Sequence, residues 1–166
     1  MSLSRRQFSL SVTALALSPV FLTACSKEAD EGPAEVRWDR ETCERCLMAI
    51  GDRNFAAQLR GAAPGETPKV HKFDDLGCAV IWLDQQSWKD NPEVEIWVND
   101  YQNGEWIDAR QAFYVINQLS PMNYGLGAQT KNTPGSLNFA QAREHIYQTE
   151  AQYQQHNNAA TTPENP

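Results

Sequence analysis

The sequence has few basic residues, few methionines and no apolar run long enough to cross a membrane. Lys and Arg number 14 against 21 Asp and Glu, so the formal net charge is −7. Binding to nucleic-acid phosphates needs a basic face, and this charge balance excludes nucleic acid as an expected partner. Hydrophobic residues make up 41% and charged residues 21% of the 166 residues. This composition predicts one compact folded domain or two small ones.

The first 24 residues predict an export signal that ends in a lipid-attachment motif. The arginine pair Arg5-Arg6 precedes an apolar run over 10–22, which is shorter than the roughly 20 residues of a membrane span. The pair is compatible with the twin-arginine route and with general secretion. Leu22-Thr23-Ala24-Cys25 resembles a bacterial lipobox, so we expect cleavage before Cys25, acylation of its sulfur and anchoring at a membrane surface.

The chain that follows the signal is predicted to be acidic and to carry polar segments at both ends. Without Arg5 and Arg6 the basic residues fall to 12 against 21 acidic ones, a net charge of −9. Ser26, where an aspartate would favour retention, predicts the periplasmic face of the outer membrane in preference to the inner membrane. Residues 25–36 are interpreted as a lipidated flexible tether, and residues 154–166 as a disordered tail.

Residues 37–100 predict a strand-strand-helix-strand unit. Apolar side chains alternate along two segments on either side of a glycine- and proline-containing turn. They then recur at three- and four-residue steps and alternate again. In chain order, these patterns predict strands at 55–59 and 70–73, a helix over 76–86 capped by Asp74 or Asp75, and a strand at 94–98.

Residues 101–153 predict a second, similar unit. The segment 106–115 is typical of a strand, 122–129 is extended and contains glycine, and 138–153 has helical spacing. Met48 and Met122 each precede a glycine by three positions, which suggests a weak internal duplication. No last strand is visible in this second unit. The fold class we predict is α+β, with two small strand-strand-helix-strand units packed together and the second lacking its last strand.

The cysteines provide the clearest chemical signal. Four are present, and acylation of Cys25 leaves Cys43, Cys46 and Cys78, an odd number for an oxidising compartment. The segment from Cys43 to Met48 reads Cys-Glu-Arg-Cys-Leu-Met, so two thiols and a thioether lie within six residues. Disulfide pairing alone therefore leaves one thiol unexplained.

Four interpretations of this segment remain open from the residues alone. A redox Cys-x-x-Cys pair needs a depressed thiol pKa, usually supplied by a following helix, but here a glycine turn and a strand are predicted. Structural zinc needs four ligands, for which Cys43, Cys46, Cys78 and His71 are available. Cys43 and Cys46 can also form an inert disulfide. Mixed cysteine and methionine ligands, finally, select the soft ion Cu(I).

Methionine usage favours the soft-metal interpretation. After the signal the only methionines are Met48 and Met122, although cores commonly use methionine as filler. Met122 follows Pro121, and such a turn can present a sulfur at the end of an extended segment. Packing of Met122 at an interface remains the alternative.

The other candidate residues have simpler structural explanations. We expect Asp74 or Asp75 to act as a helix cap in preference to a paired carboxylate site. Cys78 is expected to pack as a small buried hydrophobe. His71 shares a strand face with Phe73, so a core or surface role is favoured over a ligand role.

Taken in order along the chain, these motifs resemble the NosL family of nitrous oxide reductase accessory lipoproteins. The resemblance runs from about residue 38 to 145 and depends on five features. They are the lipobox at Cys25, Cys43-x-x-Cys46-x-Met48, Phe73-Asp74-Asp75-Leu76-Gly77-Cys78, Trp106-Ile107-Asp108-Ala109 with Phe113-Tyr114-Val115, and Ser120-Pro121-Met122.

The resemblance implies a fold, a cargo and a site. Members face the periplasm, are membrane-anchored, contain two strand-strand-helix-strand units and deliver Cu(I) for assembly of the copper centres of nitrous oxide reductase, without catalysis of their own. The implied partners are the copper-receiving enzyme or its ABC-type maturation complex. The implied Cu(I) ligands are Cys46, Met48 and Met122, with Cys43 and His71 as less certain contributors. The sequence departs from the family at Leu47, where glycine is common, and after residue 154, where a last strand is usual.

Overall fold

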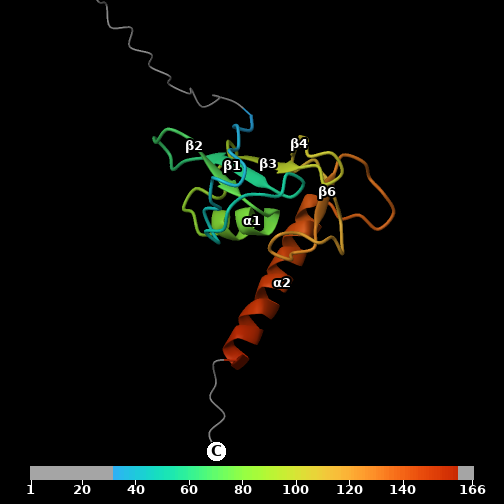
Figure 1. The fold of residues 1–166 in the computed structure, drawn as a ribbon. Coiled ribbons are helices and arrows are strands. Elements are labelled where there is room, and N and C mark those ends of the chain that lie inside the picture. The colour runs from blue at the N-terminus through green and yellow to red at the C-terminus, as the bar shows by residue number, and fades with distance from the viewer. Residues whose placement is uncertain (1–31, 161–166) are drawn as a thin grey trace, which may run out of the picture.

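The predicted strand-strand-helix-strand unit forms the larger part of the computed structural model, which describes residues 32–160 (Figure 1). Its main sheet is antiparallel throughout, with strand order β2-β1-β3-β4. The elements are β1 (Ala57–Gly61), β2 (Lys69–Phe73), α1 (Leu76–Asp84), β3 (Glu95–Asn99) and β4 (Trp106–Asp108). Each predicted strand and the helix of this unit is therefore present, with ends shifted by one or two residues.

Helix α1 packs on one face of the sheet because both surfaces are apolar. Leu59 of β1 and Phe73 of β2 are fully buried beneath it, and the helix turns Leu76, Ala79, Val80 and Leu83 inward. The helix begins at Asp75, whose carboxylate accepts a 2.9 Å hydrogen bond from the backbone N–H of Gly77. Asp75 is thus the cap that the sequence left undecided between two aspartates.

The opposite face of the sheet is partly covered by the residues that lead into it. Ala34 exchanges two 2.9 Å hydrogen bonds with the side chain of Gln58, and Lys72 donates to the carbonyl of Glu35. Ala34 and Val36 are buried. The end of the predicted tether, residues 32–36, therefore belongs to the folded body.

The segment 106–115, predicted as one strand, is divided between two sheets. Asp108 ends β4 in a turn, because its side chain accepts from the backbone N–H of Arg110 and its carbonyl accepts from Ala112. The chain then enters a second antiparallel sheet of β5 (Phe113–Val115) and β6 (Gly127–Gln129). A bridge between Asp100 and Ala128 joins the two sheets. Of the extended segment predicted at 122–129, only the last three residues are strand.

Helix α2 (Phe139–Ala160) completes the second unit and packs against α1 and β5. It starts with a reciprocal cap, in which Asn138 accepts from the N–H of Gln141 while the Gln141 side chain accepts from Asn138. Figure 1 shows its far end extending away from the sheet. The helix continues seven residues beyond the predicted end at 153, so the expectation of disorder was wrong for residues 154–160.

Within residues 32–160 the architecture is α+β, with six short strands in two antiparallel sheets and two helices, which confirms the predicted class. No strand follows α2 in this range. No helix of the described part of the chain is long and apolar enough to cross a membrane. The predicted signal, the lipobox cysteine Cys25 and residues 161–166 lie outside the described residues.

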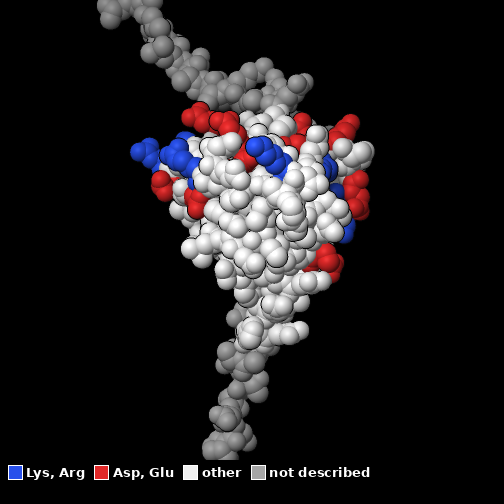
Figure 2. All heavy atoms as spheres, turned by 90° about the vertical axis from the view of Figure 1, so that its right-hand side faces the viewer, with Lys and Arg blue, Asp and Glu red and all other residues white. Residues whose placement is uncertain are grey.

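Charge is distributed unevenly over this fold. Between Arg110 and Arg143 the only charged residue is Lys131. Figure 2 shows the result on one face of the molecule, where acidic and basic side chains gather toward the sheet while a broad area below them carries neither. The residues between Arg110 and Arg143 therefore carry a single charge, that of Lys131.

Candidate metal centre

Three thiols and one carboxylate converge between the Cys43–Met48 loop and the start of α1. The sulfurs of Cys43, Cys46 and Cys78 and a carboxylate oxygen of Asp74 all lie within 4.8 Å of one another. We call these four residues the thiol–carboxylate cluster. Cys43, Cys78 and Asp74 are buried, whereas Cys46 is partly exposed. The cluster therefore has a closed inner side and an open side at Cys46.

A tight backbone loop places the first two cysteines. The N–H of Cys43 donates to the carbonyl of Met48 at 2.8 Å, and the N–H of Leu47 donates back to the carbonyl of Cys43 at 3.0 Å. A bridge between Thr42 and Ala49 closes the base of the loop. These bonds hold Cys43 and Cys46 near each other. Within the described residues no helix directly follows the motif, as the glycine turn at Gly51 predicts.

Leu47 has an unusual backbone conformation at the tip of this loop. Its φ is 63°, in the left-handed region that glycine adopts without steric cost but other residues adopt with strain. The Leu47 side chain is 75% exposed, so side-chain burial does not offset the free-energy cost of that strain. This conformation gives a physical reason for the glycine that the family resemblance implies at this position.

The two adjacent aspartates have different roles. Asp75 caps α1, and its second carboxylate oxygen accepts from the N–H of Met122 at 3.2 Å. Asp74 faces the cysteines, and the Cys46 thiol donates to its two oxygens at 3.4 and 3.5 Å. Asp74 is only 2% exposed. Its place in the cluster was missed by the sequence interpretation, although only one of two neighbouring aspartates can cap a helix.

The thiols differ in their acidity because they differ in their neighbours. A hydrogen bond from Cys78, together with backbone N–H groups of Cys46 and Asp74, lowers the pKa of Cys43 to about 6. Burial raises the pKa of Cys46 to about 12. The hydrogen bond to Cys43, followed by burial, raises the pKa of Cys78. These shifts make Cys43 the most acidic of the three thiols, and the ionisation of the cluster belongs to the three coupled sulfurs together.

Arg45, the residue between the two cysteines, brings positive charge to the cluster. Its guanidinium donates to Tyr124 at 2.9 Å and lies 3.9 Å from the sulfur of Cys78. It also forms an ion pair with Glu150 of α2, to which Tyr124 donates a 2.6 Å hydrogen bond. Burial opposes the arginine charge, but Tyr124, Cys78 and Glu150 outweigh it and raise the pKa of Arg45. The second unit thereby fixes a cation beside the sulfurs.

Close packing at the start of α1 secures this arrangement. A Cβ atom at Gly77 would overlap the ring of Tyr124, so glycine is required there for the tyrosine to reach Arg45. The closeness of α1 to the second unit therefore depends on this one residue. The pair Gly77-Cys78 was noted in the sequence, but the partner of the glycine was not.

The two predicted methionine ligands, Met48 and Met122, differ in exposure and in the element that places them. Met48 is 55% exposed at the end of the loop, two positions after Cys46. Met122 is partly buried against the core, and its backbone is fixed to Asp75, the neighbour of Asp74. Met48 therefore comes from the exposed loop of the first unit, and the backbone of Met122, in the second unit, contacts the start of α1.

His71, one of the two less certain predicted ligands, forms an aromatic group with Trp82 of α1 and Trp88. Its ring lies 4.4 Å from that of Trp82 and 6.0 Å from that of Trp88, measured between centroids. Its Nδ1 lies 3.4 Å from a carboxylate oxygen of Glu44. The structure therefore places His71 in a packing role, as the strand pattern favours, and does not bring it into the cluster.

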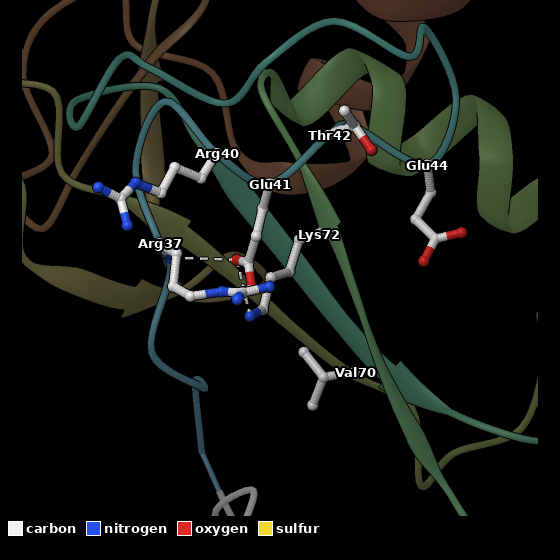
Figure 3. A pocket seen from close by; sticks show the side chains of 7 residues that line it. All are labelled: Arg37, Arg40, Glu41, Thr42, Glu44, Val70 and Lys72. Atoms are coloured by element: carbon white, nitrogen blue, oxygen red, sulfur yellow. Dashed lines mark hydrogen bonds and ion pairs between the residues drawn. The ribbon is translucent and has the colours of Figure 1, made fainter. Parts of the chain in front are cut away.

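A separate open pocket of about 350 Å³ lies on the outer side of the same loop. In Figure 3 the carboxylate of Glu41 stands between the side chains of Arg37 and Lys72, with Glu44 turned away. Burial opposes ionisation of Glu41, but hydrogen bonds from Lys72 and Arg37 outweigh it and lower its pKa. These paired charges fasten the start of the loop to β2 and leave no soft ligand for a metal. The remaining lining residues are Arg40, Thr42 and Val70.

The sequence matches the model of a known protein family. The family model for NosL matches residues 35–128, which is more than half of the 166 residues. The matched range contains the whole thiol–carboxylate cluster together with Met48 and Met122, and it ends before α2. No curated protein matches the sequence.

Proposed function

Because the chain belongs to the NosL family of copper-related accessory proteins for nitrous oxide reductase, we propose that it is a membrane-anchored, periplasm-facing Cu(I) metallochaperone. In this role it carries a single Cu(I) ion to the maturation of the copper centres of the reductase. Its partner is the copper-receiving enzyme or an ABC-type maturation complex. The copper is cargo, and the protein has no catalytic turnover.

The observation that carries this proposal is the convergence of three thiols within 4.8 Å, two of them in a loop that also carries an exposed thioether, Met48. Soft sulfur donors select Cu(I) over harder divalent ions. We assign the principal ligand to Cys46, because it can supply a thiolate at the open side of the cluster. Met48 and Met122 are proposed as thioether ligands, and Cys43 as a further thiolate.

The openness of the site suits delivery. A structural metal site is closed and four-coordinate, whereas an ion that must be passed on needs a face through which it can leave. Here Cys46 is partly exposed and Met48 is 55% exposed. Arg45 offsets the negative charge that thiolates bring to a monovalent ion, so the loaded site need not carry an unbalanced charge.

Metal competition tests the proposal. The full chain with Cys25→Ser, purified in detergent under reducing conditions, should hold about one Cu(I) against a colorimetric Cu(I) chelator and prefer it to Zn(II). Cys46→Ser in the same background is the matched control. Failure to compete together with tight stoichiometric zinc would favour a structural zinc site, and failure to bind either ion would favour a structural lipoprotein.

The anchor is a separate part of the proposal and has its own test. It depends on the lipobox at Cys25, for which we propose acylation and the periplasmic face of the outer membrane. Cys25→Ala should leave a soluble or unprocessed protein. Unchanged membrane partition with normal processing would contradict the anchor, since a net charge of −9 after processing disfavours electrostatic adhesion to anionic lipid.

A second candidate, thiol–disulfide exchange by Cys43 and Cys46, is favoured by the pKa of Cys43 of about 6. Exchange needs the low-pKa thiol to be accessible. In this structure the low-pKa thiol is fully buried, and the accessible thiol, Cys46, has a raised pKa. A disulfide reductase activity that is lost in Cys43→Ser, while Cu(I) affinity is unchanged, would favour the oxidoreductase.

A further inference from the structure

Asp74 is not explained by a site for Cu(I) alone. Its carboxylate is 2% exposed, faces the Cys46 thiol, and has no salt-bridge partner among residues 32–160. Burying a carboxylate without a paired cation is costly. Carboxylate oxygen is a poor ligand for Cu(I), but oxygen and nitrogen donors suit Cu(II). The cluster thus combines a donor for one oxidation state of copper with donors for the other.

The three thiols also divide into a pair and a single residue. Cys43 and Cys78 are both fully buried on the inner side of the cluster. Cys46 is turned toward Asp74 and the open side. The sulfurs lie within 4.8 Å of one another, and a disulfide needs them at roughly 2.05 Å, so its formation requires the two inner side chains to move toward each other.

We propose that the cluster reduces Cu(II) as it loads, with Cys43 and Cys78 as the electron donors and Cys46 kept as the copper ligand. The inference rests on the proposed Cu(I) function and adds a stoichiometric reaction to it. Two Cu(II) ions each take one electron, one from each sulfur, and become Cu(I). An S–S bond forms between Cys43 and Cys78, and the protons that these thiols carry pass to solvent. One Cu(I) stays at Cys46 and the other leaves.

In an oxidising compartment, copper must be reduced before the sulfur ligands can bind it. Copper is available there as Cu(II), whereas the sulfur ligands bind Cu(I). Asp74 lies where an entering Cu(II) would meet an oxygen donor beside Cys46. If the disulfide instead formed between Cys43 and Cys46, the reduction would destroy the main ligand.

The experiment uses the full chain with Cys25→Ser, so that only the three cluster thiols are present. Cu(I) affinity is measured first, under reductant, which tests the proposed function on its own. The reductant is then removed and Cu(II) is added under nitrogen with a Cu(I)-specific chelator. About two Cu(I) should appear per chain, because a disulfide is a two-electron couple, and free thiols should fall from three to one. Peptide mapping should find the Cys43–Cys78 disulfide and an alkylated Cys46.

Substitutions in the cluster provide a second test of the proposed reduction. Cys78→Ser leaves Cys46 as the only partner for Cys43, so Cu(II) treatment should abolish its Cu(I) binding, whereas the parent should lose only the contribution of Cys43 and keep tight binding at Cys46. Asp74→Asn should slow Cu(II) reduction at least about tenfold while changing Cu(I) affinity less than about threefold. Asp84→Asn, at the other end of α1, is the matched control and should change neither.

The parent protein decides the question even if a variant fails to fold. Normal Cu(I) affinity with three thiols retained after Cu(II), or with a disulfide mapped to Cys43–Cys46 or between chains, overturns this inference and leaves the metallochaperone function standing. Absence of Cu(I) affinity in the first measurement overturns the proposed function itself.

Discussion

The inner and open sides of the thiol–carboxylate cluster meet in one short loop, whose two cysteines differ in burial and in acidity. Cys43 on the inner side is fully buried, lies within 4.8 Å of the Cys78 sulfur of α1, and has a pKa lowered to about 6. Cys46 on the open side is partly exposed and has a pKa raised to about 12. Only two residues, Glu44 and Arg45, separate Cys43 from Cys46. Burial and neighbouring groups therefore shift the pKa values of two thiols in one short loop in opposite directions.

The two units of the fold contribute unequally to that contrast. The first unit supplies every thiol, the carboxylate and Met48. The second unit supplies Tyr124, Glu150 and Met122, which fix Arg45 and the start of α1 from outside. The thiols and the carboxylate therefore come from the first unit, and the contacts that hold Arg45 and the start of α1 in place come from the second. We call these contacts of Tyr124, Glu150 and Met122 the clamp.

The largest expected effect comes from removing the thiol of the open side. Cys46→Ser should lower Cu(I) affinity at least about a thousandfold, or about 4 kcal/mol, because it removes the thiolate that donates to the ion and neutralises it. Cys43→Ser should weaken binding by much less. Chelator competition at fixed pH measures both. Equal losses in the two variants would show that the inner and open sides act as one ligand set.

Removing the clamp should have the next largest effect. Arg45→Ala leaves Glu150 and Tyr124 without their cation, and the side chains of the ion pair are only 22% and 17% exposed, so we expect a loss of about 1–3 kcal/mol in the free energy of unfolding. Denaturant unfolding measures this. Arg40→Ala, an exposed arginine earlier in the same segment, is the control. In a double-mutant cycle with Glu150→Gln, the coupling energy between Arg45 and Glu150 should account for most of this loss in the free energy of unfolding.

The acidity of the inner side predicts a pH dependence of stability. The pKa of Cys43 is lowered in the folded protein, so between pH 6 and 9 the folded thiol is ionised while the unfolded one is protonated. The free energy of unfolding should therefore rise with pH across this range, by less than about 1.4 kcal/mol per unit, and this contribution disappears below pH 6. Unfolding at pH 6, 7 and 8 under reductant measures it. Cys43→Ser should lack the rise, and an unchanged slope in that variant would assign it to other groups.

The methionines distinguish a site shared between units from one local to the loop. Met48→Leu and Met122→Leu nearly preserve volume and should cost under about 1.5 kcal/mol of stability. Each should lower Cu(I) affinity about tenfold through the lost thioether. If Met122→Leu binds Cu(I) as the parent does while Met48→Leu is weakened, the site is confined to residues 43–48 and the clamp contributes no ligand.

Much of the fold could be predicted from the sequence because the first unit follows its apolar periodicity closely. The strands and helix at 55–98 were recognisable, since each buries one face. The second unit was harder. Its break between β4 and β5 depends on one aspartate, Asp108, that turns the chain, and α2 continues past residue 153 with few apolar residues to indicate its length.

The site was predictable in its residue types but not in its geometry. The cysteines were identified from their spacing and their odd number, which are local properties of the sequence. Asp74 and Arg45 were not assigned, because their roles come from contacts with Cys46 and with Glu150, 105 positions away from Arg45. Periodicity carries no information on which of two aspartates faces a cluster.

The smallest expected effect concerns the tip of the loop that joins the two sides. Leu47 adopts a left-handed backbone with φ of 63° and exposes 75% of its side chain. Leu47→Gly should remove that strain and, after the added chain entropy of the unfolded state, stabilise the protein by about 0.5–1 kcal/mol. Leu47→Ala keeps the strain and removes the exposed side chain, so it should be neutral and serves as the control. Denaturant unfolding of the reduced protein compares them. If glycine and alanine behave alike, the conformation of Leu47 is not strained, and the departure from glycine acts only through the exposed side chain beside Cys46.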